Sequence, residues 1–170
     1  MKDICKSFAI LHKELKEINP DLRIILTVSP VRHTKDGMAE NQVSKSILRA
    51  ACHYLTTDYQ DVEYFPSYEI MMDDLRDYRF YKPDMIHPNE VAEQYIFEKF
   101  SETYFDDNLK DFIKIWHPIR KALNHRPFNE KSASHQAFLR KLLGDLEGIS
   151  RLVNVEQEME NTRKQLLIHQ

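Results

Sequence analysis

Apolar residues recur every three or four positions in the first segment of the chain, which predicts an amphipathic helix over residues 4–18. The positions that follow this spacing are Ile4, Phe8, Leu11, Leu15 and Ile18. Residues 22–29 then form a nearly continuous apolar and β-branched run that Pro30 ends. Such a run is typical of a strand buried on both faces of a parallel sheet. The pattern therefore predicts the helix-then-strand half of a βαβ unit.

The apolar spacing predicts further elements as far as residue 106: a helix over 38–59, a strand over 62–65, a short helix around 70–75 and a long helix over 89–105. In the helix over 38–59, the residues expected to face inward are Val43, Ile47, Ala50, Ala51, Tyr54 and Leu55. Two strands cannot complete a parallel sheet, because each needs neighbours along its edges. We therefore expect residues 1–106 to be the second half of a larger α/β domain.

The pattern changes after this segment, and residues 107–170 are predicted to be helical throughout. Apolar positions follow helical spacing at Leu139, Leu142, Leu146, Ile149 and Val153, and more loosely at Met159 and Leu166. Glu156 and Glu160 interrupt a strict heptad, which favours a helical hairpin or a partner-binding face over a coiled coil. We expect two domains, 1–106 and 107–170.

Composition narrows the function classes. The chain has 170 residues, of which 42% are apolar and 30% charged, which favours a folded protein. Its net charge of −3 gives no indication of nucleic-acid binding. Three glycines are too few for a phosphate-binding loop or a dinucleotide fingerprint. Cys5 and Cys52 lack zinc-site spacing and are expected to be thiols on helix faces. No apolar run is long enough to span a membrane, so we expect a cytoplasmic protein. We also expect no cofactor.

The strongest candidate for chemistry is the segment Tyr81–Pro88, which places Asp84 three residues before His87 in a loop that precedes a helix. Histidine can accept and return a proton near neutral pH. A carboxylate on the same loop can accept from the other ring nitrogen and fix the tautomer. In the alternative reading, Asp84 or Asn89 only caps the helix and His87 is an exposed loop residue.

His33 is a second candidate, because it follows the carboxyl end of the predicted buried strand. Catalytic and ligand groups gather at that edge of open parallel sheets, so His33 could bind substrate or polarise a carbonyl; otherwise it is a surface histidine beside Arg32. His33, Asp84 and His87 together could also ligate a metal. We disfavour that reading, because no His-x-x-x-His pair supports it. The other histidines, His12 among them, show no convergent partners in the sequence.

A nucleophile is not evident. None of the candidate serines lies in a glycine-flanked turn that would expose its oxygen beside free backbone donors. These serines are Ser7, Ser29, Ser44, Ser46 and Ser67.

Five segments of the chain, in the same order, resemble the C-terminal half of the GSCFA family, which is grouped with the SGNH (GDSL-like) hydrolases. The segments are Ile25–Val31 with His33, Asn41–Arg49, Tyr64–Glu69, Tyr78–Tyr81 and Asp84–Pro88. The resemblance extends over residues 1–105, and the tail is similar only to the family's variable extension.

The resemblance implies an α/β fold of the flavodoxin-like, SGNH type, with three α/β/α layers, and a hydrolase of small ester or acyl substrates. It assigns Asp84 and His87 as the triad aspartate and base. The family's serine lies in the Gly-Ser-Cys-Phe-Ala motif of its N-terminal half, and this sequence contains neither that motif nor Gly-x-Asn-Asp. We expect the chain alone to be inactive and its open edges to be covered by a second copy or by the missing N-terminal half. The alternative is a catalytically incomplete module that binds a partner through its helical tail.

Overall fold

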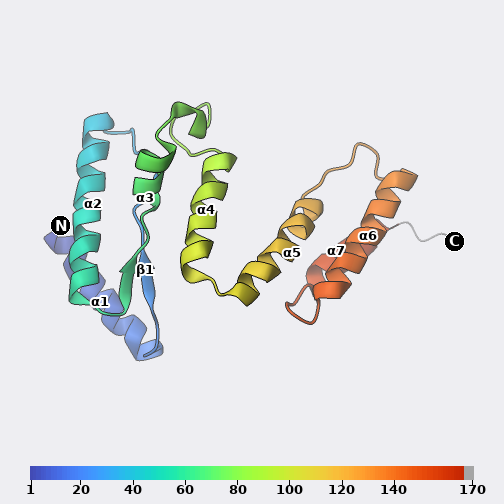
Figure 1. Ribbon diagram of the computed structural model, residues 1–170, viewed down its shortest axis with the longest axis horizontal. Coiled ribbons are helices and arrows are strands. Elements are labelled where there is room, and N and C mark those ends of the chain that lie inside the picture. The colour runs from blue at the N-terminus through green and yellow to red at the C-terminus, as the bar shows by residue number, and fades with distance from the viewer. Residues whose placement is uncertain (167–170) are drawn as a thin grey trace. The chain divides into compact units, whose positions relative to one another are not determined.

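The computed structural model describes residues 1–166 and divides the chain into two compact units, Met1–Tyr104 and Phe105–Gln170. The first unit mixes helices with two strands, and the second is helical in its described part (Figure 1). The first unit contains α1 (Lys2–Ile18), β1 (Ile24–Leu26), α2 (Met38–Asp58), β2 (Val62–Tyr64), α3 (Ser67–Glu69), the π-helical turn η1 (Ile70–Leu75), the 3-10 turn η2 (Tyr78–Phe80) and α4 (Glu90–Tyr104). The second contains α5 (Asp107–Leu123), α6 (Ala133–Ile149) and α7 (Glu156–Gln165).

The two strands of the first unit pair in parallel, with Ile24 opposite Val62 and Leu26 opposite Tyr64. The crossover between them is α2, so β1, α2 and β2 form a βαβ unit, whereas the sequence pattern indicates only α1 and β1 as the second half of such a unit. Figure 1 shows the strands between α2 and α4. The ring of Phe65, just beyond β2, lies 5.1 Å from that of Phe100 on α4. The first unit is therefore a mixed α/β structure with helices on both sides of a two-stranded sheet.

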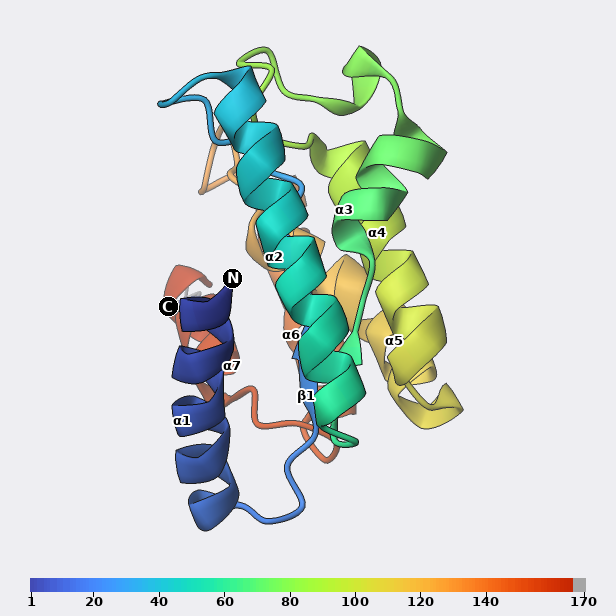
Figure 2. The ribbon, with the colours of Figure 1, turned by 90° about the vertical axis from the view of Figure 1, so that its left-hand side faces the viewer.

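Helix α1 lies beside the C-terminal part of α2 (Figure 2). The rings of Phe8 and Tyr59 meet edge to face at 5.7 Å between centroids. No residue of α1 is fully buried, and Ile18 at its C-terminal end is 81% exposed. The apolar stripe of α1 is thus only partly covered by the described residues.

The strand predicted over residues 22–29 is shorter and less buried than expected. Only Ile24–Leu26 form the strand, and Ile25 is 38% exposed. A strand needs a pairing neighbour and a covering layer on each face to be fully buried, and β1 has one pairing neighbour among residues 1–166.

The predicted inward face of α2 was also partly wrong. Ala51 and Leu55 are buried as expected, but Val43, Ile47 and Tyr54 are 40–50% exposed. In the first half of the helix, the polar residues Asn41 and Lys45 are buried instead. Both bond to the backbone of the loop after β1. These hydrogen bonds attach segment 29–33 to the first half of α2.

Each unit has its own apolar core. In the first, Met71, Leu75, Tyr81 and Ala92 form a buried cluster. In the second, the cluster consists of Ile119, Leu142, Leu146, Ile149 and Val155. Three of the leucine-pattern positions predicted from sequence (Leu142, Leu146 and Ile149) are members of this second core.

Candidate active site

The loop that carries Asp84 and His87 is closed by backbone hydrogen bonds. Tyr81 and Pro88 face each other in an isolated antiparallel bridge. Inside it, the Lys82 amide donates to the His87 carbonyl at 2.8 Å. The Met85 amide donates to the Lys82 carbonyl at 2.9 Å, and Met85 adopts a left-handed conformation with φ of 60°. We call residues 81–88 the dyad loop; its backbone fixes the spacing between Asp84 and His87.

Asp84 and His87 contact each other as the sequence predicted for an acid–imidazole pair. Asp84 Oδ2 lies 2.8 Å from His87 Nδ1. Asp84 Oδ1 accepts from the amides of Ile86 (2.8 Å) and His87 (3.0 Å). These two backbone donors, followed by the imidazole, lower the pKa of Asp84 to about 2. An ionised Asp84 accepts a hydrogen bond, so it favours the tautomer with the proton on Nδ1 and a free lone pair on Nε2.

The pair is accessible from solvent. The side chains of His87 and Asp84 are 52% and 44% exposed. Within residues 1–166, no hydrogen bond to His87 Nε2 is made. Nε2 is therefore open to a proton donor that is not among these residues.

The helix cap is Asn89 and not Asp84. Asn89 Oδ1 accepts from the amide of Ala92 at 3.1 Å, in the first turn of α4. Its amide nitrogen donates to the Arg79 carbonyl at 2.6 Å. Both parts of the alternative reading are therefore observed, since Asn89 caps the helix and His87 is 52% exposed, and Asp84 also contacts the imidazole.

His33 does not join the pair. Its Nε2 lies 3.0 Å from Asp36 Oδ2 in its own loop, and the side chain is 55% exposed. The neighbouring residue makes the contact instead: the Arg32 amide donates to the Ile86 carbonyl at 3.2 Å, and Arg32 Nη1 donates to the Met85 carbonyl at 2.9 Å. The segment after β1 thus contacts the dyad loop through Arg32, while His33 remains exposed in the same segment.

Lys45 on α2 was missed from the sequence. Its side chain is 7% exposed, and its ammonium donates to the carbonyls of Ser29 (2.5 Å) and Val31 (2.8 Å). Burial lowers the pKa of this lysine. The signal that could have identified it is its four-residue spacing from Asn41, which places both polar residues on one helix face.

The candidate serines in the described part of the chain are engaged away from His87. Ser67 is buried and donates to the Val28 carbonyl at 3.0 Å. Ser29 accepts from the amide of Val31, while Ser44 and Ser46 lie within α2. Among residues 1–166, no serine or cysteine forms a hydrogen bond with His87.

A second aspartate–histidine pair exists where the sequence gave no sign of one. His12 Nε2 lies 3.1 and 3.0 Å from the two carboxylate oxygens of Asp61. Lys16 Nζ lies 2.9 Å from Asp61 Oδ2. The hydrogen bond from the Lys16 ammonium is the largest cause of the lowered pKa of Asp61, about 2; desolvation opposes it, and the hydrogen bond with His12 lowers the pKa further. The expectation that His12 has no convergent partner was therefore wrong.

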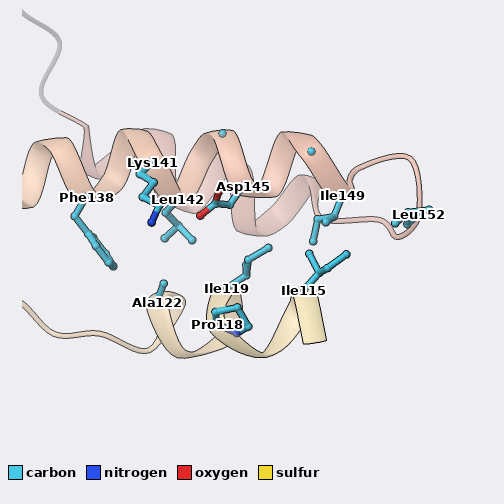
Figure 3. Close-up of a pocket in the computed structure, with 12 residues that line it drawn as sticks. Ile115, Pro118, Ile119, Ala122, Phe138, Lys141, Leu142, Asp145, Ile149 and Leu152 are labelled. Carbon is cyan, nitrogen blue, oxygen red and sulfur yellow. The ribbon is translucent and has the colours of Figure 1, made fainter. Parts of the chain in front are cut away.

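The second unit carries an apolar groove between α5 and α6 (Figure 3). Its volume is about 710 Å³. Ile115, Pro118 and Ile119 point into it from α5, and Leu142 and Ile149 from α6, while Lys141 and Asp145 add charge (Figure 3). Leu152, in the loop after α6, borders the groove and is 68% exposed.

Two kinds of feature are absent from residues 1–166. No cluster of three or more His, Cys, Asp or Glu side chains could hold a metal ion. No helix in the same range is long and apolar enough to cross a membrane.

Comparison with known families identifies the chain. Residues 1–100 match the GSCFA family, and residues 116–168 match the C-terminal domain of GSCFA domain proteins. The chain belongs to the GSCFA family. The first match includes the whole dyad loop, and the second covers most of the second unit. No curated protein and no solved structure matched this GSCFA chain.

Proposed function

We propose that this GSCFA chain contributes the acid–base part of a serine-dependent hydrolase of small ester or acyl substrates. The observation that carries the proposal is the closed dyad loop, in which the Asp84 carboxylate orients the His87 imidazole and leaves Nε2 free. In this proposal, Nε2 takes the proton from a serine hydroxyl as the oxygen attacks the carbonyl carbon. The same nitrogen then returns the proton to the departing alcohol or amine, and water releases the acyl group by the reverse sequence.

The nucleophile in this proposal comes from a segment outside the 170 residues, such as the N-terminal half that the family resemblance implies. The geometry around Ser29 and Ser67 supports this, because each hydroxyl is engaged with backbone groups of its own surroundings. The parallel β1–α2–β2 unit, with α4 on its other side, agrees with part of an SGNH-type α/β/α fold. A further strand could pair with the open edge of the β1–β2 sheet and extend the sheet.

Fluorophosphonate labelling of the purified chain, with adducts located by peptide mass mapping, tests the proposal. We expect no stoichiometric serine adduct on the folded chain alone, because the nucleophile is elsewhere. In an assembly that includes the nucleophile segment, we expect one adduct that His87→Ala abolishes. His12→Ala is the matched control, since it removes the other partner of an aspartate–histidine pair and should leave labelling intact. An adduct that persists in His87→Ala would refute the role of His87.

An adduct on the chain alone would have a different meaning. If one serine were labelled and His87→Ala abolished the label, the ester-hydrolase chemistry would stand, and the chain would hold its own nucleophile. The mapped serine would then replace the external one in the mechanism.

The groove between α5 and α6 favours a second candidate function, partner binding by the helical tail. A groove of about 710 Å³ with an apolar lining is of the size that accepts an amphipathic helix or an apolar ligand. Leu152→Glu places a charge at its rim and should weaken any complex that the groove forms. Analytical ultracentrifugation of wild type and variant measures this for self-association, and identical sedimentation over a concentration series would argue against a second copy as the partner.

A further inference from the structure

Arg32 differs from the other arginines of the first unit. Arg23, Arg49, Arg76 and Arg79 each lie within an ion-pair distance of a carboxylate. Within residues 1–104, Arg32 forms no such ion pair. Its side chain lies over the rings of Tyr78 and Tyr81 and bonds to the dyad loop.

Three contacts join Arg32 to the dyad loop. Its backbone amide donates to the Ile86 carbonyl at 3.2 Å. Its Nη1 donates to the Met85 carbonyl at 2.9 Å. Its guanidinium carbon lies 4.0 Å from the ring centroid of Tyr81, which is buried and forms one side of the bridge that closes the loop. Arg32 therefore contacts the loop at its closure and next to both Asp84 and His87.

Lys45 secures the segment from which Arg32 projects. Its buried ammonium donates to the carbonyls of Ser29 and Val31, the residues on the amino side of Arg32. Asn41, one turn earlier on α2, accepts from the amide of His33 on the other side at 2.8 Å. The segment 29–33 is thus attached to α2 before and after Arg32.

We propose that Lys45 and Arg32 are positioning residues that connect α2 to the dyad loop and set the geometry of the Asp84–His87 pair. The role rests on the proposed function, because it concerns the acid–base pair assigned there. Neither residue needs to touch a substrate: Lys45 orients segment 29–33, and Arg32 fixes the carbonyls of Met85 and Ile86. Those two residues stand between Asp84 and His87, so a shift in their peptides moves the amides that Asp84 accepts from.

Titration of the Asp84 carboxyl by NMR reads out this geometry without any substrate. Two backbone amides keep the pKa of Asp84 at about 2 rather than at its ordinary 3.8. Arg32→Ala should raise this pKa toward 3.8, and it should speed amide exchange of Ile86 and His87 by about tenfold as the loop opens locally. Arg32→Lys keeps the charge but loses the planar group over Tyr81, so its effect should be intermediate.

Two controls separate a local effect from general ones. Arg79→Ala removes a nearby arginine whose side chain pairs with Asp77 and stacks on Phe80, and it should leave Asp84 at about 2. Asp61, which also titrates at about 2, reports whether the rest of the first unit is folded in each variant. Lys45→Met should raise the pKa of Asp84 less than Arg32→Ala does, because the contacts of Arg32 remain.

The outcomes decide the inference. A raised Asp84 pKa with Asp61 unchanged supports it, and an Asp84 that titrates at about 2 in Arg32→Ala overturns it. If Arg32→Ala raises the pKa of both Asp84 and Asp61, Arg32→Lys decides: a raised Asp84 pKa with an unchanged Asp61 pKa supports the inference, and an unchanged Asp84 pKa overturns it. An unchanged Asp84 in Lys45→Met removes Lys45 from the role. Failure of the proposed function would appear separately, as fluorophosphonate labelling that does not depend on His87 while the Asp84 titration still responds to Arg32.

Discussion

Two aspartate–histidine pairs in the first unit use the same chemical groups in different ways. Asp61 and His12 are 49 residues apart and join the loop before β2 to α1. Their side chains are 25% and 15% exposed, and Lys16 shares the carboxylate. Asp84 and His87 are three residues apart in one loop and are 44% and 52% exposed.

The main difference between the two pairs is which ring nitrogen of the histidine faces the carboxylate. His12 directs Nε2 to Asp61, and its ring packs against Tyr59 at 4.3 Å between centroids. His87 directs Nδ1 to Asp84, which leaves its outer nitrogen, Nε2, for another group. The carboxylates differ as well: Asp61 is bound by side chains from α1, and Asp84 by amides of its own loop. A pair that joins two elements and a pair proposed for acid–base chemistry can therefore share the same residue types, and the comparison teaches that geometry separates them.

The largest expected effect separates the pairs by catalysis. In an assembly that supplies the nucleophile, Asp84→Asn should lower kcat for ester hydrolysis by about 10⁴-fold, as loss of the triad carboxylate does elsewhere. Asp61→Asn should leave kcat nearly unchanged, because that carboxylate does not contact the dyad loop. Steady-state rates with short p-nitrophenyl esters measure both. Equal losses of kcat in the two variants would show that the two pairs do not differ in catalysis.

For thermal stability we expect the opposite order, with the larger effect from substitution of Asp61. Asp61→Ala removes the contacts of both His12 and Lys16 and so loosens α1 from the strand pair; we expect the melting temperature of the chain to fall by several degrees. Asp84→Ala affects one exposed loop and should lower it less. Differential scanning calorimetry on the two variants and on wild type gives the ranking, and a larger fall for Asp84→Ala would contradict it.

The sequence predicted the pair that is local and missed the pair that is not. Asp84 and His87 are visible because their partner lies three residues away, whereas nothing in the sequence relates His12 to Asp61 before α1 is placed beside the strands. The order of helices and strands followed from apolar spacing in the same way. The inward face of α2 did not: Asn41 and Lys45 turn inward and bond to the backbone of segment 29–33, while Val43 and Ile47 are exposed. Apolar periodicity contains no information about such polar contacts.

Titration should distinguish the causes that keep each aspartate ionised. Lys16→Met should raise the pKa of Asp61 from about 2, because the Lys16 hydrogen bond is its largest cause. His87→Ala should leave most of the depression at Asp84, since two backbone amides dominate there. The folded-state pKa of each carboxyl lies below its unfolded value of about 3.9. Each ion's stabilising effect is therefore present above about pH 4 and is lost as the pH falls through about 2. Carboxyl chemical shifts over this range give both values, and an Asp84 that responds as strongly as Asp61 would show that side chains govern both pairs.

The smallest expected effect concerns the backbone that makes a local pair possible. Met85 is left-handed with φ of 60°, while the residues around Asp61 have no positive φ. A side chain other than glycine or asparagine disfavours this conformation. We therefore expect Met85→Asn to increase the free energy of unfolding by about 0.5–1 kcal/mol. Met85→Val, with a β-branched side chain, should decrease it. Urea denaturation compares the three proteins, with the Asp84 titration as a check that the loop keeps its geometry. If neither substitution changed stability, the dyad loop would not depend on the left-handed residue, and the spacing of Asp84 and His87 would be set by the loop's backbone hydrogen bonds and the contacts from Arg32.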